Sequence, residues 1–369
     1  MTTAGGRSLP RLAGAVLLMA TLLTVLFVTP APGSAAVRQA PADSDDAALK
    51  LLQRSADAAR TCPYTGVQFI SAWSGTGTST SVVDVTHHPG HGTMMRVRGT
   101  GNEPSGGAYV LDDPSQAQAP AGGLSGPTDE QLWLLGRNYT VHPAPEGTVG
   151  ADDTVGGRAA RVVEVRRRDG SVAARFWIDK AENLLLRREI FDSSGRLVQA
   201  SAFVSVELHG GDMAAAATEP RPPWGDRLRT ADITRLRRAG WTIPASLPGG
   251  LSLYDARRGG GPSAPVLHLG YSDGLSVVSL FVQRGRLDDA RLGGWRRVER
   301  HRSVMYVSGT VQQRLAWAAR GHVYTVFADA PGDVTAKVVA ALPHESRPGF
   351  WTRIGHGLTR VVSWLNPFA

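Results

Sequence analysis

The feature that most constrains the fold is a run of alternating polar and apolar residues over residues 158–208. Three turn signals interrupt this run: Arg168-Asp169-Gly170, Lys180-Ala181-Glu182-Asn183 and Ser193-Ser194-Gly195. Turn residues between alternating segments are typical of β-hairpins, so the run predicts an antiparallel meander of four strands. In the last predicted strand, six apolar residues fall on one face: Val198, Ala200, Ala202, Val204, Val206 and Leu208. We therefore expect a one-sided sheet, which must be covered by helices, by another sheet or by an apolar ligand.

The segment that precedes the meander predicts a helix followed by strands. Residues 44–60 begin with Ser44, a good N-cap, and place five apolar residues on one helical face: Ala48, Leu51, Leu52, Ala56 and Ala59. Residues 67–70 and 81–85 are rich in β-branched side chains and predict two strands. Residues 100–127 are rich in Gly, Pro and Ser, which predicts a long mobile loop.

A composition break at residues 210–223 divides the chain, and we place a linker there between a domain over 44–209 and a second domain over 224–342. In the second domain, strands are expected at 266–271, 275–282, 303–307, 314–318 and 322–327. A helix is expected at 331–342 with Pro331 at its first position. The 43 Gly and 23 Pro of the 369-residue chain also favour turn-rich β structure. The predicted class is α+β, mostly antiparallel β.

The N-terminus predicts export. Arg7 and Arg11 precede a charge-free apolar stretch over residues 12–28, which is followed by small residues suited to signal cleavage. Residues 1–35 therefore predict a signal peptide, with an uncleaved membrane anchor as the alternative. The formal net charge of +8 would suggest nucleic acid. An exported basic protein, however, meets anionic membrane or cell-wall surfaces rather than nucleic acid. We therefore expect an anionic surface as its partner and no nucleic acid.

The C-terminal tail over residues 349–369 is basic and amphipathic. If helical, it would present one apolar face flanked by tryptophans, which predicts a membrane or partner helix. The candidate residues are Trp351, Ile354, Leu358, Val361 and Leu365. Packing of the tail against its own domain is the alternative.

One motif could indicate an enzyme. Residues 270–274 match the G-x-S-x-G pattern of hydrolases, with Ser272 as the nucleophile. In hydrolases this serine lies between a strand and a helix, whereas the residues after Gly274 predict a strand. We therefore interpret Ser272, Asp273 and Gly274 as a hairpin turn and expect no enzymatic activity and no cofactor.

Metal and anion sites receive little support from the sequence. His87, His88 and His91, with Cys62 upstream, have the chemistry of zinc ligands, but their spacing fits no closed site. We expect solvated loop histidines, a buried inert Cys62 and no metal. The arginine runs 166–168 and 296–297 divide between two strand faces, which favours a solvated surface over an anion-binding one.

Several large apolar residues lie on the predicted strands or near them. Each alone is typical of a core, but as a set on a curved sheet they form candidate walls of a hydrophobic cavity. The set comprises Phe69, Trp73, Trp133, Phe176, Trp177 and Val204.

Three parts of the chain resemble the RseB/MucB family of extracytoplasmic sigma-factor regulators. They are a helix followed by Tyr64-Thr65-Gly66, the meander with its Arg175-Phe176-Trp177-Ile178-Asp179 segment, and Trp241 to Leu251 followed by His268-Leu269-Gly270-Tyr271-Ser272-Asp273-Gly274-Leu275. The likeness covers about residues 49–342, and its N-terminal part is also similar in outline to lipoprotein carriers of the LolA type. The insertion at 100–127 and the tail do not map onto the Gram-negative members.

The resemblance implies an N-terminal half-open β-barrel covered by helices and a smaller β-rich C-terminal domain. It also implies a regulatory function outside the cytoplasm. With the predicted export signal, we expect the protein in a periplasm-like space or at the outer face of the cytoplasmic membrane. Family members bind the extracytoplasmic domain of a membrane anti-sigma factor, modulate its proteolysis and release it when a lipid-like ligand signals envelope stress. The alternative from another class is a lipid or lipoprotein carrier of the cell envelope.

Overall fold

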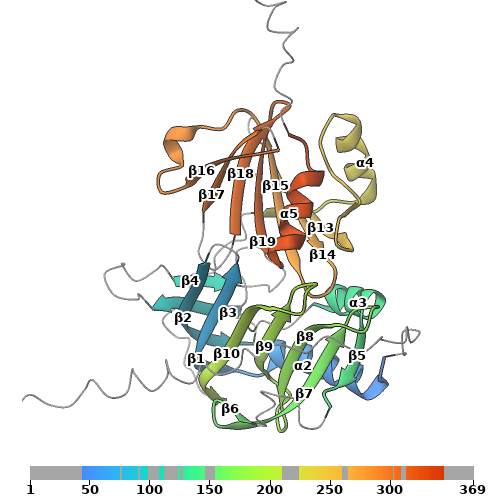
Figure 1. The fold of residues 1–369 in the computed structure, drawn as a ribbon, viewed down its shortest axis with the longest axis vertical. Helices are drawn as coiled ribbons and strands as arrows, with labels where there is room; N and C mark the ends of the chain where they lie inside the picture. Colours follow the sequence, from blue (N-terminus) through green and yellow to red (C-terminus); the bar gives the residue numbers. More distant parts are fainter. Residues whose placement is uncertain are drawn as a thin grey trace, which may run out of the picture. The chain divides into compact units, whose positions relative to one another are not determined.

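The computed structural model describes residues 44–74, 77–89, 92–98, 108–111, 124, 128–145, 154–209, 224–259, 265–301, 303–308 and 313–344. All of them belong to one compact unit, Pro41–Ala369. The described strands form two antiparallel sheets, which we call the first and the second sheet (Figure 1). Four α-helices, α2 to α5, accompany them. The predicted α+β class with mostly antiparallel β structure is confirmed.

The first sheet contains ten described strands. Nine follow the order β4-β3-β2-β1-β10-β9-β8-β7-β5, and β6 pairs with β7. The end strands β4 and β5 do not pair with each other, so the described strands close no barrel. The bounds are β1 (Tyr64–Ser74), β2 (Gly77–His88), β3 (Gly92–Arg98), β4 (Ala108–Leu111), β5 (Thr140–Pro143), β6 (Thr154–Val155), β7 (Arg158–Arg166), β8 (Val172–Asp179), β9 (Leu185–Phe191) and β10 (Leu197–Leu208).

The predicted meander is confirmed, because β7, β8, β9 and β10 pair in chain order. Its three turns contain residues with positive φ, namely Gly170 at 83°, Asn183 at 60° and Gly195 at 77°. Glycine and asparagine adopt this left-handed conformation most readily, which explains why these positions punctuate the alternating pattern.

The predicted single apolar face of β10 is wrong, and a β-bulge is the reason. Val67 pairs with Ser205 but Gln68 pairs with Phe203, so Val204 is the extra residue of the bulge. The shift leaves Val204 52% exposed and buries Phe203, which is 3% exposed. Ser201, on the face opposite Ala202, is also buried. Near this strand the sheet is covered on both faces.

Helix α2 (Asp46–Thr61) confirms the first predicted helix and its apolar face. Leu51 and Leu52 belong to the core of the first sheet together with strand residues such as Trp177. The N-cap is Asp45, whose carboxylate accepts from Ala48 N. The expected cap, Ser44, instead accepts a hydrogen bond from Val141 N. Ser44 and Asp45 can both act as an N-cap. Because the Ser44 hydroxyl is used by Val141 on β5, Asp45 caps the helix.

The second sheet contains nine described strands. Its order is β11-β13-β14-β15-β19-β18-β17-β16, and β12 pairs with β13. The bounds are β11 (Trp224–Arg227), β12 (Ser246–Leu247), β13 (Leu251–Gly259), β14 (Val266–Ser272), β15 (Val277–Arg284), β16 (Arg296–Arg300), β17 (Ser303–Ser308), β18 (Gln313–Ala319) and β19 (His322–Asp329). All five strands predicted here are present. Helix α5 (Gly332–Ala341) buries Val338 and Val339 in the core of this sheet, and Pro331 is its N-cap rather than its first residue.

The sequence interpretation missed several elements. Helix α3 (Asp129–Asn138) begins with a capping box between Thr128 and Gln131, a signal that was present in the sequence. Helix α4 (Thr230–Arg238) follows β11 and buries none of its residues fully. Strand β4 and the buried Leu124 lie within the predicted loop 100–127, so this segment is not simply a loop. The predicted linker 210–223 lies outside the described residues.

Candidate functional site

The β14–β15 hairpin contains the G-x-S-x-G sequence. Ser272 is 0% exposed, donates its hydroxyl to Ser276 O at 2.9 Å and accepts from Gly274 N at 3.0 Å. Oδ1 of Asp273 accepts from the backbone nitrogens of Leu275 and Ser276. Each polar group thus organises the turn, and a strand follows it as predicted. This geometry lacks the exposed serine of a nucleophile elbow.

The same hairpin docks against residues that flank the first sheet. Tyr139 donates its hydroxyl to Asp273 Oδ2 at 2.7 Å, and the Asn138 side chain donates to Asp273 O at 3.0 Å. Arg188, on β9, donates to Leu275 O at 2.8 Å, and the Leu275 side chain belongs to the core of the first sheet. Burial, then the Asp273 charge and hydrogen bond, raise the Tyr139 pKa, which keeps this hydroxyl a neutral donor.

Glycine is required at position 274 by a close approach. Gly274 has φ of 102°, and a Cβ atom there would lie 2.3 Å from Leu135 N and 2.4 Å from Leu135 Cα. Leu135 belongs to α3, so these are backbone atoms of a helix and cannot move aside cheaply. The hairpin and α3 therefore meet at backbone distance.

Polar contacts continue along the junction. Asp329 at the end of β19 accepts from Gln199 Nε2 at 2.8 Å and lies 3.6 Å from Arg188. Ser193 donates to Asp333 at 3.2 Å. This explains why Gln199 on β10 is nearly buried despite its polar side chain.

A pocket of about 420 Å³ lies beside the docked hairpin. Its charged lining residues are Arg167, Arg168, Asp273, Asp333 and Lys337, and its apolar lining includes Ile190, Phe191 and Leu275. The Arg167 guanidinium is already used within the protein, because it donates to Val172 O and Phe191 O. Arg168 is exposed, and Lys337 Nζ is 3.8 Å from Asp333. Donors and acceptors of both signs suit a polar polymer such as a peptide better than a purely apolar ligand.

The predicted cavity residues do not line this pocket. Phe69 and Trp73 are half-buried on β1, Phe176 and Trp177 are buried on β8, and Trp133 and Val204 are 59% and 52% exposed. Phe176 and Trp177 are consecutive in a strand and point to opposite faces. The hydrophobic cavity stays a prediction.

The expectation of solvated histidines is wrong for His87. Its ring is 7% exposed, stacks on Tyr64 with centroids 5.2 Å apart and bonds through Nδ1 to Thr93 at 2.8 Å. Burial lowers the His87 pKa. Cys62 is buried as predicted, and burial, then the Glu182 charge, raise its pKa. Its neighbours are Glu182 and His209 rather than His87. His91 lies outside the described residues.

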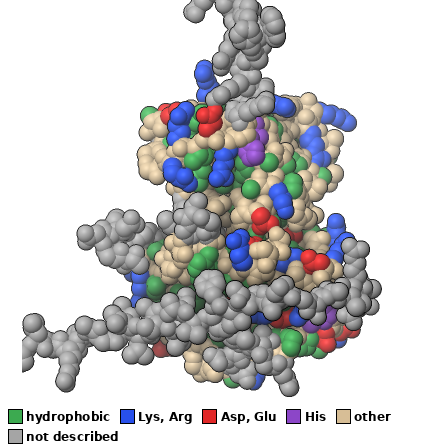
Figure 2. Space-filling model, in the orientation of Figure 1, with side chains coloured by type: hydrophobic (Ala, Val, Ile, Leu, Met, Phe, Trp, Pro, Cys, Tyr) green, Lys and Arg blue, Asp and Glu red, His purple; other side chains and the backbone are tan. Residues whose placement is uncertain are grey.

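The arginine runs do not form one basic field. Arg166 bonds to Glu164 on the same strand face, while Arg296 and Arg297 are exposed on β16. On the face drawn in Figure 2, Lys and Arg side chains are interspersed with acidic, apolar and neutral ones. The predicted signal 1–35 and the tail with Trp351, Ile354, Leu358, Val361 and Leu365 lie outside the described residues. No helix in the described part of the chain is long and apolar enough to cross a membrane.

Comparison with known proteins gives one family match. Residues 131–223 match the model of the MucB/RseB N-terminal domain. No curated protein matches the chain.

The solved structures that match the chain share little sequence with it. A crystal structure of MucB is 18% identical, with a TM-score of 0.46, and the alignment covers 82% of this chain and 100% of that one. The Pseudomonas aeruginosa MucA/MucB complex is 18% identical, with a TM-score of 0.41 and coverage of 81% and 100%. A LolA superfamily protein from Nitrosomonas europaea is 12% identical, with a TM-score of 0.22 and coverage of 45% and 94%. The family match, which begins within α3 and includes the whole meander, confirms the resemblance seen in the sequence: residues 131–223 are similar to the MucB/RseB N-terminal domain.

Proposed function

We propose that this protein is a non-enzymatic regulator that binds the extracytoplasmic domain of a membrane anti-sigma factor. Binding modulates proteolysis of the anti-sigma factor, and so sigma-factor activity, in response to envelope stress or a hydrophobic ligand. The match of residues 131–223 to the MucB/RseB N-terminal domain carries this proposal. The predicted signal segment supports an extracytoplasmic location, and the use of Ser272 within a turn supports binding rather than catalysis.

The pocket beside the β14–β15 hairpin is the contact site that we assign to the partner. Arg168 and Lys337 offer charged donors there, and Asp333 offers an acceptor, so an extended peptide could satisfy its backbone and its acidic side chains. The hydrogen bonds of Asn138 and Tyr139 fix the hairpin that forms one wall. A preformed wall lowers the ordering cost of binding.

Regulation by a ligand follows from linkage. A hydrophobic ligand that binds the free protein better than the complex weakens the complex by the same factor. Regulation of this kind needs only that the ligand has different affinities for the free protein and for the complex. It predicts that ligand and anti-sigma factor reduce each other's binding reciprocally.

The test begins with affinity capture by the purified mature protein from a detergent-solubilised membrane extract of its own organism. Mass spectrometry should identify a single-span anti-sigma factor as the leading protein. Co-purified lipid without such a partner would overturn the proposal in favour of a lipid or lipoprotein carrier.

The contact site is tested with the extracytoplasmic segment of the captured partner. Arg168→Ala and Lys337→Ala should each weaken its binding by about fivefold or more, as expected for loss of a charged contact at an interface. Arg235→Ala is the matched control, because Arg235 is an exposed arginine on α4 that pairs only locally with Asp232. Equal affinities for all three variants would place the partner elsewhere on the protein.

A further inference from the structure

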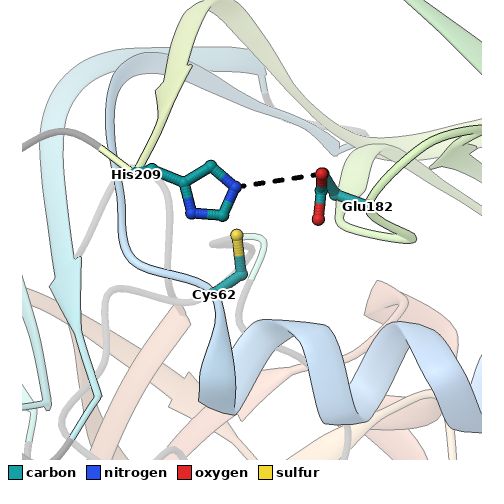
Figure 3. Close-up of side chains that lie close together, drawn as sticks. All are labelled: Cys62, Glu182 and His209. Carbon is teal, nitrogen blue, oxygen red and sulfur yellow. Dashed lines mark ion pairs between the residues drawn. The ribbon is translucent and has the colours of Figure 1, made fainter.

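Three side chains with metal-ligand chemistry converge at one end of the first sheet, away from the pocket. Cys62 is the C-cap of α2, Glu182 lies in the turn between β8 and β9, and His209 follows β10. The sulfur, one carboxylate oxygen and one ring nitrogen all lie within 4.8 Å of one another. Figure 3 shows the thiol pointing toward the space between the imidazole and the carboxylate.

Backbone hydrogen bonds hold each segment in place. The ligand atoms themselves make only long contacts among the described residues: the Cys62 thiol donates to Pro63 O at 3.7 Å, and His209 Nε2 lies 3.8 Å from Glu182 Oε1. Cys62 N donates to Ala58 O, and His209 N donates to Pro63 O at 2.8 Å, which fixes His209 beside the cysteine. Asp179 accepts from Ala181 N and Glu182 N and is held by Arg158, so the turn that carries Glu182 is also ordered. His209 adopts φ of 59°, a conformation that is unusual for a residue other than glycine.

One ligand–ligand distance is close to that in a coordinated ion, and the other two are at most 4.8 Å. His209 Nε2 is 3.8 Å from Glu182 Oε1. Two such ligands on a tetrahedral zinc ion would be about 3.4 Å apart, given metal–ligand bonds of about 2.0 to 2.2 Å. The His209 and Glu182 side chains are 65% and 43% exposed, so both can rotate by this small amount without repacking the core.

The donor set selects the class of ion. Thiolate and imidazole together favour zinc and related transition metals over calcium or magnesium, which prefer oxygen ligands. Cys62 as thiolate and Glu182 would balance the charge of a divalent ion, while the nearby Asp179 is already paired with Arg158. Three protein ligands leave one tetrahedral position for water.

We propose that Cys62, Glu182 and His209 bind one divalent transition-metal ion of the zinc class. The bound ion joins the end of α2, the β8–β9 turn and the end of β10. It therefore fixes the point where the chain leaves the first sheet. The sequence interpretation paired Cys62 with His87, His88 and His91 and missed this set, because its members are distant in sequence.

The test is titration of the tag-free mature protein with Zn²⁺ and with Co²⁺. We expect one ion per chain, a higher Tm with metal, and a thiolate-to-cobalt charge-transfer band in the near ultraviolet. Cys62→Ser should abolish the band. His209→Gln and Glu182→Gln should weaken binding at least about tenfold, since loss of even an outer partner of a metal site costs about 10- to 100-fold.

Matched controls separate this site from adventitious binding. His142→Gln and the exposed Glu130→Gln remove the same chemistry on β5 and α3 and should leave affinity and the cobalt spectrum unchanged. His209 and Glu182 are surface side chains, so their variants remain folded even where Cys62→Ser does not. A cobalt spectrum without a thiolate band, or an affinity unchanged in both His209→Gln and Glu182→Gln, would overturn the proposal.

Discussion

The two sheets differ in how they bury polar groups. Four carboxylates of the first sheet and its turns are at most 6% exposed, and each pairs with arginine: Glu164, Asp179, Glu189 and Asp192. In the described part of the second sheet the comparable pairs are those of Asp255 with Arg257 and Arg227. Two further ionisable groups of this sheet and its turns are buried: Asp273 accepts hydrogen bonds within the β14–β15 turn, and His268 stacks on Phe281 with centroids 4.8 Å apart. The first sheet thus depends on paired charges, and the second depends more on neutral packing.

This difference teaches how a sheet tolerates buried charge. In the first sheet Glu164 lies two residues from Arg166, so both side chains share one strand face and can pair without long-range help. Such pairs lose stability when the carboxylate loses its charge. A buried neutral histidine, in contrast, destabilises the folded protein when it is protonated and becomes charged. The two sheets should therefore respond differently to mutation and to acid.

The largest effect is expected where the two sheets are joined. Gly274→Ala places a Cβ against the backbone of α3, so the hairpin must undock and lose the bonds from Asn138, Tyr139 and Arg188. We expect a loss of about 4 kcal/mol in unfolding free energy and separate transitions for the two sheets in denaturant titrations.

Gly285→Ala is the control for this variant. Gly285 also has positive φ, at 135°, but its Cβ would meet nothing within 4 Å. The backbone strain of alanine at this φ should alone cost about 1 to 3 kcal/mol. If both variants unfold in one transition with equal loss, the hairpin does not join the sheets in the way described.

The next largest effect tests the paired charges. Glu164→Gln removes the partner of both Arg166 and Arg175 at a site that is 1% exposed, and should cost about 3 kcal/mol. Asp255→Asn in the second sheet should cost less, because Arg227 is 59% exposed and water can replace its partner. Urea titrations of both variants measure this ranking, and an equal or reversed ranking would contradict the comparison.

The two sheets should lose stability in different ranges of acidic pH. Burial lowers the pKa of His268 to about 4, below the unfolded value of about 6.5. The unfolded chain therefore binds the proton first, and the stability of the second sheet should fall by about 2 kcal/mol between pH 6.5 and 4.5. Hydrogen bonds and Arg158 outweigh burial and lower the Asp179 pKa, so its contribution is lost only below about pH 3.8.

The pH experiment compares His268→Gln with the parent protein. The unfolding free energy of the variant should change less between pH 6.5 and 4.5, even if the substitution also changes its stability at pH 7. Gly274→Ala adds resolution, because it lets the transition of each sheet be followed separately. If His268→Gln leaves the pH dependence of the unfolding free energy unchanged, this histidine does not cause the loss of stability in acid.

The sequence predicted what local chemistry decides. The meander, the hairpin at Ser272 and helix α2 follow from alternation, turn residues and helical periodicity, which act within a few residues. The choice between Ser44 and Asp45 as N-cap could not be predicted, because a hydrogen bond to Val141 on a distant strand decides it. Helix α3 was predictable in principle from its capping box.

The sites depend on contacts that no local pattern encodes. The docking of Asp273 onto Tyr139 and the convergence of Cys62 with Glu182 and His209 bring together segments from different elements. Single residues of these sites were noticed in the sequence, but their partners were not. The hydrophobic cavity stays a prediction: its six residues share a chemistry, and the strand directs the neighbours Phe176 and Trp177 to opposite faces.

The smallest effect tests the β-bulge, where the alternating pattern failed. A regular strand would bury Val204, and truncation to alanine would then cost about 2 kcal/mol or more. In the structure Val204 is 52% exposed, so Val204→Ala should change the unfolding free energy by less than about 0.5 kcal/mol. Phe203→Ala, at the 3% exposed neighbour, should cost about 3 kcal/mol. A regular register would reverse this contrast, because it would bury Val204 and turn Phe203 to the other face. Thermal unfolding of both variants therefore tests the bulge, and a larger loss at Val204 than at Phe203 would mean that β10 keeps a regular register.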